Sequence, residues 1–337
     1  MEPIVYGLSN KQYHRGEQER EYLSSSQLKW YLKSPRHAKF MLDALTYGDA
    51  KAAQNCKAVA DLIEGKSDAL RFGSLFHDLM ESYAAHHEDE FAAIRQWEQG
   101  MAIFEPPINK STNKPYGATS NPYKEEYAAF LQANEDKLIV GRDEADLAYN
   151  MANSLLRDSG ATSEQVRKLL KWAKATEVSY FYETEDGIKL KVRPDLLTRG
   201  KLVDWKTCSL DSLDEESIAR QIIKYRYDVS LSMYQYVLHE IEGKWYMPIL
   251  VFVQKQEPFD AVMCDISEWC YSYDPDEDFV KPGVGAIEFK KLLDLHTECT
   301  KNNEWPGVES SIEADGNTRI MKPAVPYWLG MKYFEEF

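Results

Sequence analysis

Polar and apolar residues alternate along the stretch from Thr176 to Thr207, and this alternation predicts three short strands. Residues 177–183 alternate and are rich in aromatic and β-branched side chains. The turn signal Glu185-Asp186-Gly187 follows, and residues 188–197 form the predicted return strand. A second turn at residues 199–201 leads to the third predicted strand, residues 202–206. The stretch therefore predicts a hairpin with one further strand after it.

Helical periodicity surrounds these strands. Residues 72–84 have apolar positions at helical spacing, which predicts an amphipathic helix. Further predicted helices cover residues 124–174, 218–241 and 289–300. The remaining predicted elements are an apolar strand over 245–253, its partner over 259–265 and a long loop over 98–123. Together the patterns predict an α/β fold, in which a mixed sheet has helices on its faces and a helical N-terminal part covers one side.

Charged residues interrupt the apolar pattern of the strands at positions that converge. Asp204 and Lys206 stand two apart on the third strand, so strand geometry puts both side chains on one face. If the hairpin is in register, the return strand places Asp195 beside that pair, and Glu177 joins from the first strand. The sequence therefore predicts three carboxylates and one amine in a small patch.

Carboxylates packed so closely favour a metal ion among them. They raise one another's pKa unless a cation lies between them, and oxygen ligands of this kind suit Mg²⁺ or Mn²⁺. An ion held by Asp195 and Asp204 would activate a water and bind a phosphate oxygen, while Lys206 would stabilise charge on the phosphate. This chemistry predicts a metal-dependent phosphodiesterase. The alternative is a surface hairpin whose charges are solvated.

Composition fits a globular protein, but the net charge works against a nucleic-acid ligand. The chain has 337 residues, enough for one large domain or two small ones, and a net charge of −15. Phosphate binding depends on lysine and arginine, so their distribution matters more than the total. Basic residues cluster near positions 29–39, 167–174, 189–193 and 220–226. We interpret these clusters as a basic channel with acidic outer walls.

Neither a membrane anchor nor a secretory signal is predicted. The sequence has no run of about eighteen apolar residues. Its N-terminus lacks the basic region and apolar core of a signal peptide. We therefore expect a cytoplasmic protein that does not bind membranes.

The charged motif resembles the core of the PD-(D/E)xK nucleases. Glu177, the run Arg193-Pro194-Asp195 and the run Val203-Asp204-Trp205-Lys206-Thr207 carry this resemblance. Within that superfamily the chain is most similar to the RecE (exonuclease VIII) exodeoxyribonucleases of phages and prophages. Further matches to that group are Tyr13-His14, the segment SSSQLKWYLKSPRHAKF, the run RFGSLFH that ends at His77, and Trp305-Pro306-Gly307.

The resemblance implies a role for each residue of the predicted site. It implies that His77, Asp195, Asp204 and the backbone carbonyl of Trp205 bind the metal ion. Glu177 would bind a second Mg²⁺ or Mn²⁺ ion or position water, and Lys206 would act in catalysis. The implied DNA contacts are Arg193, Thr207, Tyr227, Ser230 and Tyr234. Ser230 departs from the family pattern, which has glutamine at that position, and the shorter side chain loses reach.

Cysteines add little to this picture. The five are odd in number and scattered, which argues against a disulfide framework. Some relatives in the superfamily hold an iron–sulfur cluster, and Cys56 with Cys264, Cys270 and Cys299 has a distant likeness to that arrangement. The close cysteine pair of a cluster site is absent, so ordinary thiols are predicted.

The implied function is a metal-dependent exonuclease that degrades one strand of linear double-stranded DNA from its 5′ end and leaves 3′ overhangs. Such enzymes serve recombination beside a RecT-like single-strand annealing protein, and relatives form homo-oligomeric rings. The implied organisation is one nuclease domain over residues 1–337. Its parts would be a mainly helical region (1–170), an α/β core (171–305) and a tail (306–337).

Two other functions fit the same residues. The nuclease core also supports a structure-specific or nicking endonuclease. A protein of another class, an acidic binding protein that inhibits a host DNA enzyme without catalysis, would fit the net charge of −15 and Ser230. The crowding of four charged residues argues against an idle site.

Overall fold

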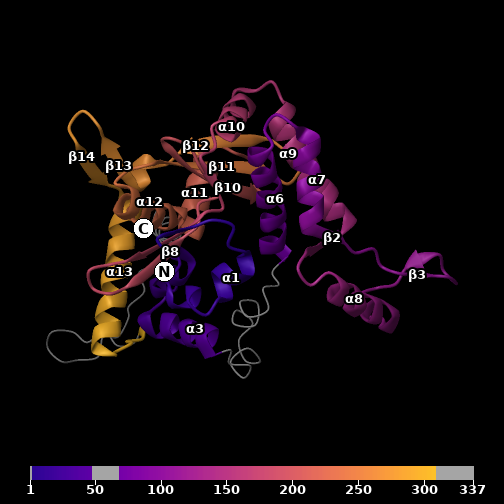
Figure 1. Cartoon of the computed structure of the whole chain (residues 1–337), viewed down its shortest axis with the longest axis horizontal. Coiled ribbons are helices and arrows are strands. Elements are labelled where there is room, and N and C mark those ends of the chain that lie inside the picture. Colours follow the sequence, from indigo (N-terminus) through magenta and orange to yellow (C-terminus); the bar gives the residue numbers. More distant parts are fainter. Residues whose placement is uncertain (1, 48–67, 309–337) are drawn as a thin grey trace, which may run out of the picture.

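A five-stranded mixed sheet lies at the centre of the computed structural model, which describes residues 2–47 and 68–308 (Figure 1). Its strand order is β12-β11-β10-β9-β6, with β10 and β11 parallel and the other neighbours antiparallel. The strands are β6 (Ala175–Thr176), β9 (Leu196–Leu197), β10 (Lys201–Cys208), β11 (Met247–Gln254) and β12 (Ala261–Asp265). β11 is buried from its second residue to its last, as its continuous apolar sequence predicts for a central strand.

A second sheet continues the predicted hairpin. It has the order β1-β7-β8 and consists of β1 (Ile4–Val5), β7 (Ser179–Glu183) and β8 (Lys189–Val192). Gly187, with a φ of 77°, makes the predicted turn between β7 and β8. Pairing in this sheet has the same register as pairing between β6 and β9, so one hairpin passes from the second sheet into the first.

The hairpin is interrupted where the chain changes sheets. The predicted return strand over 188–197 is in fact two strands, β8 and β9, and the first predicted strand begins at Ser179 instead of Glu177. Residues 193–195 leave the ladder between β8 and β9, and Glu177 lies between β6 and β7. Glu177 has a φ of 50°, a left-handed conformation that no extended strand contains.

Three pairs of short strands lie outside these sheets. They are β2 (Met101–Ile103) with β5 (Leu138–Val140), β3 (Ile108–Asn109) with β4 (Lys114–Pro115), and β13 (Tyr271–Asp274) with β14 (Phe279–Pro282). β2, β3 and β4 correct the prediction of a loop over residues 98–123, and β5 interrupts the helical stretch predicted over residues 124–174. The β3–β4 hairpin projects from the molecule beside α8 (Figure 1).

Helices make up most of the remaining described chain. The α-helices are α1 (Asn10–Arg15), α2 (Ser25–Leu28), α3 (Pro35–Tyr47), α6 (Asp68–Ala85), α7 (Glu90–Gly100), α8 (Asn121–Ala133), α9 (Arg142–Arg157), α10 (Ala161–Lys171), α11 (Glu215–Tyr225), α12 (Tyr227–Glu242) and α13 (Val284–Asn302). The 3₁₀-helices are η1 (Glu19–Glu21), η2 (Lys29–Leu32) and η3 (Ser267–Trp269). Among the helices in these ranges, none combines the length and the apolar character needed to cross a bilayer.

Polar side chains start several of these helices, as their sequence predicts. Ser24 and Gln27 form a capping box at α2, and the side chain of Asp214 accepts a hydrogen bond from the backbone N–H of Ser217 at α11. The single helix predicted over residues 218–241 is in fact two helices. Arg226, with a φ of 53°, ends α11 and begins α12, and its guanidinium donates two hydrogen bonds to Asp228.

Two hydrophobic clusters cover the opposite faces of the main sheet. Leu202 belongs to the cluster that contains α12 and α13, whereas Val203 and Trp205 belong to the cluster that contains α6, α9 and α10. This alternation along β10 follows from the period of two in a strand. The predicted α/β architecture, a mixed sheet with helices on its faces, is confirmed.

Some predictions fall partly or wholly outside the described residues. Cys56 and the tail after residue 308 lie outside the described residues. Cys208, Cys264, Cys270 and Cys299 are free thiols. The boundary predicted near residue 170 stays a prediction, although β1 from the N-terminal part pairs with β7 of the core.

Candidate metal centre

Three carboxylates occupy one row across neighbouring strands of the main sheet. Leu196 on β9 pairs with Val203 on β10 and with Thr176 on β6. The next positions in both registers are Asp195, Asp204 and Glu177. The backbone N–H of Glu177 donates to the carbonyl oxygen of Pro194 at 3.1 Å, which holds this row together where the strands end. The predicted convergence of the three carboxylates therefore follows from strand register.

Glu177 reaches this row through a strained backbone. A positive φ in a residue other than glycine costs on the order of 1 kcal/mol or more, and such residues concentrate at functional sites. The left-handed turn occurs where the hairpin passes between sheets. The strain therefore belongs to the same feature that brings the Glu177 carboxylate to Asp195.

His77 comes from α6 and completes the group from the other side. Its Nδ1 lies 3.5 Å from Oδ2 of Asp195, and its Nε2 lies 2.9 Å from the carbonyl oxygen of Trp205. Oδ2 of Asp195 also accepts a hydrogen bond from the backbone N–H of Trp205 at 2.7 Å. The ligand atoms of His77, Glu177 and Asp195 all lie within 4.8 Å of one another.

Asp204 and Lys206 share one face of β10 and form an ion pair of 2.5 Å. The side chain of Asp204 is 14% exposed and that of Lys206 20%, so the pair borders solvent without being open to it. The ammonium of Lys206 lies 5.0 Å from the centre of the Tyr227 ring, and Tyr227 stacks on Tyr225. The predicted placement of both charges on one face is confirmed.

Burial and mutual repulsion disturb the carboxylates of this site. Burial raises the pKa of Glu177, and the charge of Asp195 raises it further. Burial also raises the pKa of Asp204, against the opposing effect of Lys206. Burial would raise the pKa of Asp195 too, but the charge and hydrogen bond of His77 outweigh it and lower that pKa.

The ammonium of Lys206 stays charged in this setting. Its burial lowers its pKa, but the charges of Asp204 and Asp195 outweigh burial and raise it. A divalent cation would neutralise the buried negative charge of the carboxylates that Lys206 alone does not balance. Carboxylate oxygens, one imidazole nitrogen and one backbone carbonyl form a donor set that fits Mg²⁺ or Mn²⁺.

Two residues near the site were missed in the sequence. Glu81 lies one turn after His77 on α6, and its Oε1 is 3.5 Å from Oγ1 of Thr176. Burial raises its pKa. Lys29 donates to the carbonyl oxygen of Tyr225, and burial together with the charge of Lys206 lowers its pKa to about 8. The four-residue spacing from His77 could have identified Glu81, whereas nothing in the sequence links Lys29 to Lys206.

The predicted DNA contacts are distributed unevenly around the site. Tyr234 is close enough to the site to feel its charges: burial raises the pKa of Tyr234, and the charges of Asp204, Asp195 and Glu177 raise it further. Ser230 lies on the same helix, where its hydroxyl donates to the carbonyl oxygen of Arg226 at 3.4 Å. Thr207 alternates to the face of β10 opposite Asp204 and Lys206.

Arg193 is held inside the protein. It is 7% exposed, and its guanidinium donates to Oγ of Ser179, to Oδ1 of Asn10 and to the carbonyl oxygen of Leu8. The same group lies 4.1 Å from the centre of the Tyr13 ring. With these partners the guanidinium is not available to a phosphate, so its position does not support the predicted DNA contact.

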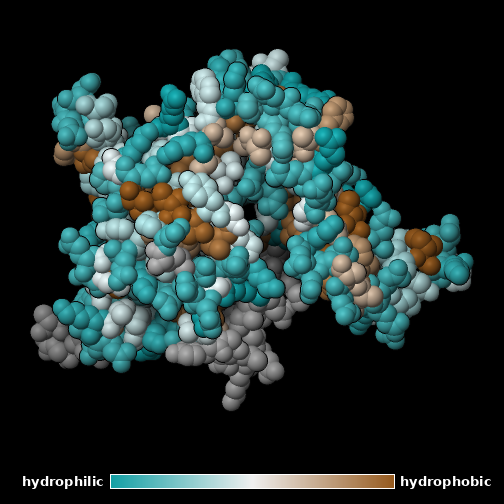
Figure 2. All heavy atoms as spheres, viewed as in Figure 1, coloured by the Kyte–Doolittle hydropathy of each residue, from teal (hydrophilic) through white to brown (hydrophobic). Residues whose placement is uncertain are grey.

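The surface around α6 is hollowed next to the N-terminal part of the chain. Figure 2 shows this face as mainly hydrophilic, with the hollow between α6 and the region that carries α1. His77 is on the helix that borders the hollow.

Comparison with known proteins places most of the chain in one family. The model of a family described as "PDDEXK-like domain of unknown function (DUF3799)" matches residues 24–314. A crystal structure from Eubacterium rectale, whose description suggests an exonuclease, is similar with a TM-score of 0.48 and 14% sequence identity, over 95% of this chain and 97% of that chain. A likeness at this level carries no conclusion about activity. A search of the curated proteins found no match.

Proposed function

Since this chain belongs to the family of PDDEXK-like domains, we propose that it is a metal-dependent nuclease that digests linear double-stranded DNA from its ends. The family and the architecture agree with the PD-(D/E)xK core predicted from the sequence. Both support a nuclease. The exonuclease activity and the RecE type are the finer part of the proposal.

The observation that carries the proposal is the meeting of three ligand groups, those of His77, Glu177 and Asp195, beside the ion pair of Asp204 and Lys206. Asp195, Asp204 and Glu177 share a row of the sheet, and His77 reaches it from α6. Lys206 is paired with Asp204 within that group. Carboxylates buried side by side are costly, and this arrangement is stable when a cation is bound among them.

These residues divide into groups that hold the metal and groups that act beside it. Asp195, Asp204, His77 and the carbonyl of Trp205 would hold a divalent ion, with Glu177 at a second ion. When bound, such an ion lowers the pKa of a coordinated water and polarises a phosphate oxygen. Lys206, which stays protonated, stabilises the negative charge that develops on the phosphate.

Glu177 is the group suited to move a proton. Burial raises its pKa, so that once ionised beside a bound cation it is a stronger proton acceptor than an ordinary carboxylate. From its position next to Asp195 it would orient the attacking water or accept its proton. Either role uses the same row of the sheet.

The resemblance to the RecE group supports the finer proposal. We propose 5′ to 3′ digestion that leaves 3′ single-stranded overhangs for recombination, with a RecT-like annealing protein as partner. We further propose a homo-oligomeric ring, in the cytoplasm of a bacterial host.

Digestion of end-labelled linear duplex DNA by the wild type and by Asp204→Ala tests the proposal. We expect Mg²⁺- or Mn²⁺-dependent release of nucleotides by the wild type. The variant should lose activity by at least about 100-fold, because it lacks a metal ligand. Its circular dichroism spectrum should stay unchanged. The order in which label is released from 5′ and 3′ ends gives the polarity.

Covalently closed circular DNA is the control substrate. An exonuclease leaves it intact because it has no end. Cleavage of the circle would replace the exonuclease with an endonuclease or nickase that uses the same site. Equal activity of the wild type and Asp204→Ala on linear DNA would refute the site itself.

A further inference from the structure

A hollow of about 730 Å³ lies beside α10, at the start of β10 and β11. Its floor includes Leu169, which is buried. Its rim is basic and aromatic, and consists of Lys168, Trp172, Arg199 and Lys201, with Met247 beside them. The proposed nuclease chemistry uses none of these residues.

Positive charge collects at this hollow although the chain carries a net charge of −15. Within the described part of the chain, the side chains of Arg199 and Lys201 make no ion pair or hydrogen bond with protein groups. Lys168 pairs only with Glu164, one turn away, in an exposed contact that contributes little to stability. These cations are therefore available to a negatively charged ligand.

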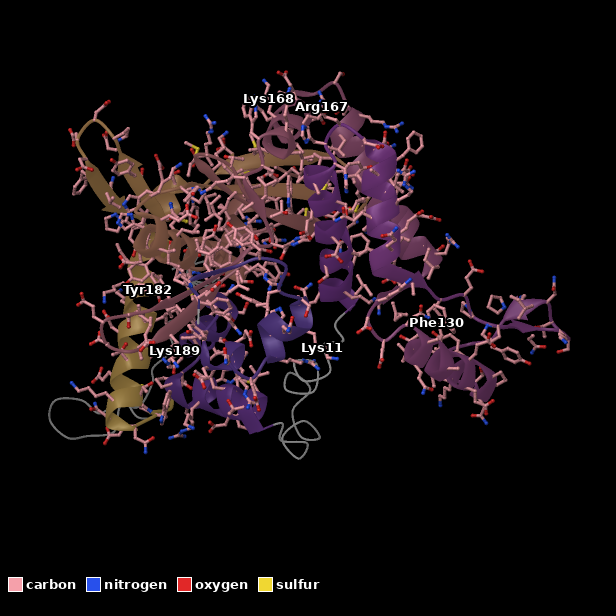
Figure 3. The ribbon with its side chains drawn as sticks, in the orientation of Figure 1. Lys11, Phe130, Arg167, Lys168, Tyr182 and Lys189 are labelled. Atoms are coloured by element: carbon pink, nitrogen blue, oxygen red, sulfur yellow. The ribbon has the colours of Figure 1, made fainter. Side chains whose placement is uncertain are left out.

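The basic surface continues over α10 into a second hollow of about 380 Å³. Arg157, Arg167 and Lys171 line this second hollow together with Glu88 and Glu90. Arg157 pairs with Glu90, and Arg167 donates to the carbonyl oxygens of Leu156 and Asp158. The hydroxyl of Tyr83, which lines it as well, is buried without a hydrogen-bond partner. Figure 3 labels Arg167 and Lys168 on α10 at the outer edge of the molecule. We call the residues Arg167, Lys168, Lys171, Trp172, Arg199 and Lys201 the α10 basic surface.

Trp172 decides which polyanion this surface fits. The indole is 61% exposed at the end of α10, between cations of the same surface. An exposed indole beside lysine and arginine suits an unpaired base, which stacks on the ring while the cations bind the phosphates. The bases of a duplex are stacked on each other and offer no free face to such a ring. The surface therefore favours a single strand over a duplex.

The α10 basic surface is also close to the candidate metal centre along the chain. Lys201 begins β10, and Asp204 follows three residues later, about 10 Å away at the rise of a strand. We infer that this surface binds the unpaired DNA strand that remains when its partner is digested, an inference that rests on the proposed function. Binding there would hold the remaining strand while the other strand lies at the metal centre.

Anisotropy of fluorescein-labelled poly-dT tests this site in the full-length chain with Asp204→Ala, which prevents digestion. Added to that chain, Trp172→Ala should weaken poly-dT binding by roughly 5- to 150-fold, the loss of one stacked base. Trp172→Phe should retain most of the affinity, because phenylalanine also stacks. Neither change should alter the affinity for blunt duplex DNA.

A charge-reversal pair tests the phosphate contacts. Arg199→Glu with Lys201→Glu should weaken poly-dT binding and lower the salt dependence by about 1.4 in the slope of log K against log[salt], for two lost contacts. The matched control reverses Lys110 and Lys114 on the exposed β3–β4 hairpin, which changes the net charge equally. The control pair should bind poly-dT like the parent chain.

The outcomes separate this inference from the proposed function. Unchanged poly-dT binding by Trp172→Ala would overturn the inference, as would equal losses for duplex DNA or for the control pair. If the wild type digests DNA while Trp172→Ala still binds poly-dT normally, only the strand site fails. If the wild type digests no DNA but poly-dT binding depends on Trp172, the proposed function fails and the strand site stands.

Discussion

Arg193 illustrates how much a single side chain depends on partners that its own sequence neighbours do not reveal. Its place beside Pro194 and Asp195 gives it the appearance of a DNA contact. In the fold, it connects the N-terminal segment around Leu8 and Asn10 to Ser179. Those partners lie far away in the chain, so no local pattern could have predicted this role.

We predict that Arg193→Ala destabilises the protein by about 3 kcal/mol or more, because hydrogen bonds from a charged group contribute about 1.5–3 kcal/mol each. Urea denaturation followed by circular dichroism measures this change. The stability of Arg193→Lys, which keeps the charge but loses the several N–H donors of the guanidinium, should lie between that of the wild type and that of Arg193→Ala. Unchanged stability with weaker binding to DNA would instead restore the predicted contact.

The parts of the site that were predicted follow a regular sequence pattern, and the parts that were missed do not. Asp204 and Lys206 are on one face because a strand alternates, and this rule can be applied to the sequence directly. The left-handed backbone of Glu177 follows no such rule. Any residue with a side chain avoids that conformation, so only the surrounding fold can impose it.

Elements whose periodic pattern repeats over many residues were predicted well, and short elements were predicted poorly. The helix α6 and the strand β11 have continuous apolar patterns and match their predictions closely. β2, β3 and β4 contain two or three residues each, too few to show a period. The break between α11 and α12 was missed because Arg226 is neither proline nor glycine.

The close packing of α12 against α13 gives a prediction for Gly285. A Cβ at this position would lie 2.6 Å from the carbonyl carbon of Asp228, so Gly285→Ala should force the helices apart and destabilise the protein by about 1–3 kcal/mol. The control is Gly73→Ala on α6, where no atom beyond the neighbouring residues and the backbone of the same helix lies within 4 Å of the new Cβ.

Thermal unfolding of both variants provides the measurement. Gly73→Ala should raise the free energy of unfolding by about 1 kcal/mol, because alanine favours a helix more than glycine does. A lower melting temperature for Gly73→Ala and an unchanged one for Gly285→Ala would contradict the packing described for these helices.

At the scale of the molecule, the candidate metal centre joins the two hydrophobic clusters. His77 comes from α6, which packs in one cluster, and Asp204 faces the side of the sheet that the other cluster covers. An ion bound by both would link the halves of the fold. Because it binds the folded chain only, it should stabilise that chain.

We predict that Mn²⁺ raises the melting temperature, with a gain of about 2.7 kcal/mol when the ion is at 100 times its Kd. The gain should shrink as the pH falls from about 9 to about 6. Burial lowers the pKa of His77, but Asp195 outweighs it and raises that pKa to about 9, and burial raises the pKa of Glu177 to about 8, so both must lose a proton to bind the ion. Burial raises the pKa of Asp204 to about 6, against the opposing charge of Lys206, so at lower pH the ion must displace a proton. Because the pKa of Asp204 is higher in the fold than in the unfolded chain, the metal-free protein loses stability as the pH rises toward about 6.

Differential scanning fluorimetry at several pH values measures this effect. Asp195→Asn, which keeps the shape of the side chain but removes its charge, should abolish most of the shift. A shift of equal size in that variant would mean that Mn²⁺ stabilises the protein from elsewhere.

The shared register of the hairpin across two sheets limits how this chain can change in length. Glu177 and Asp195 stand opposite each other because equal numbers of residues separate them from Asp186, at the centre of the turn. One residue inserted into β7 or β8 alone would slide the partners past each other and turn one carboxylate toward the opposite face. Insertions and deletions there must therefore come in matched pairs, so homologues that keep both carboxylates should differ in hairpin length only by even totals.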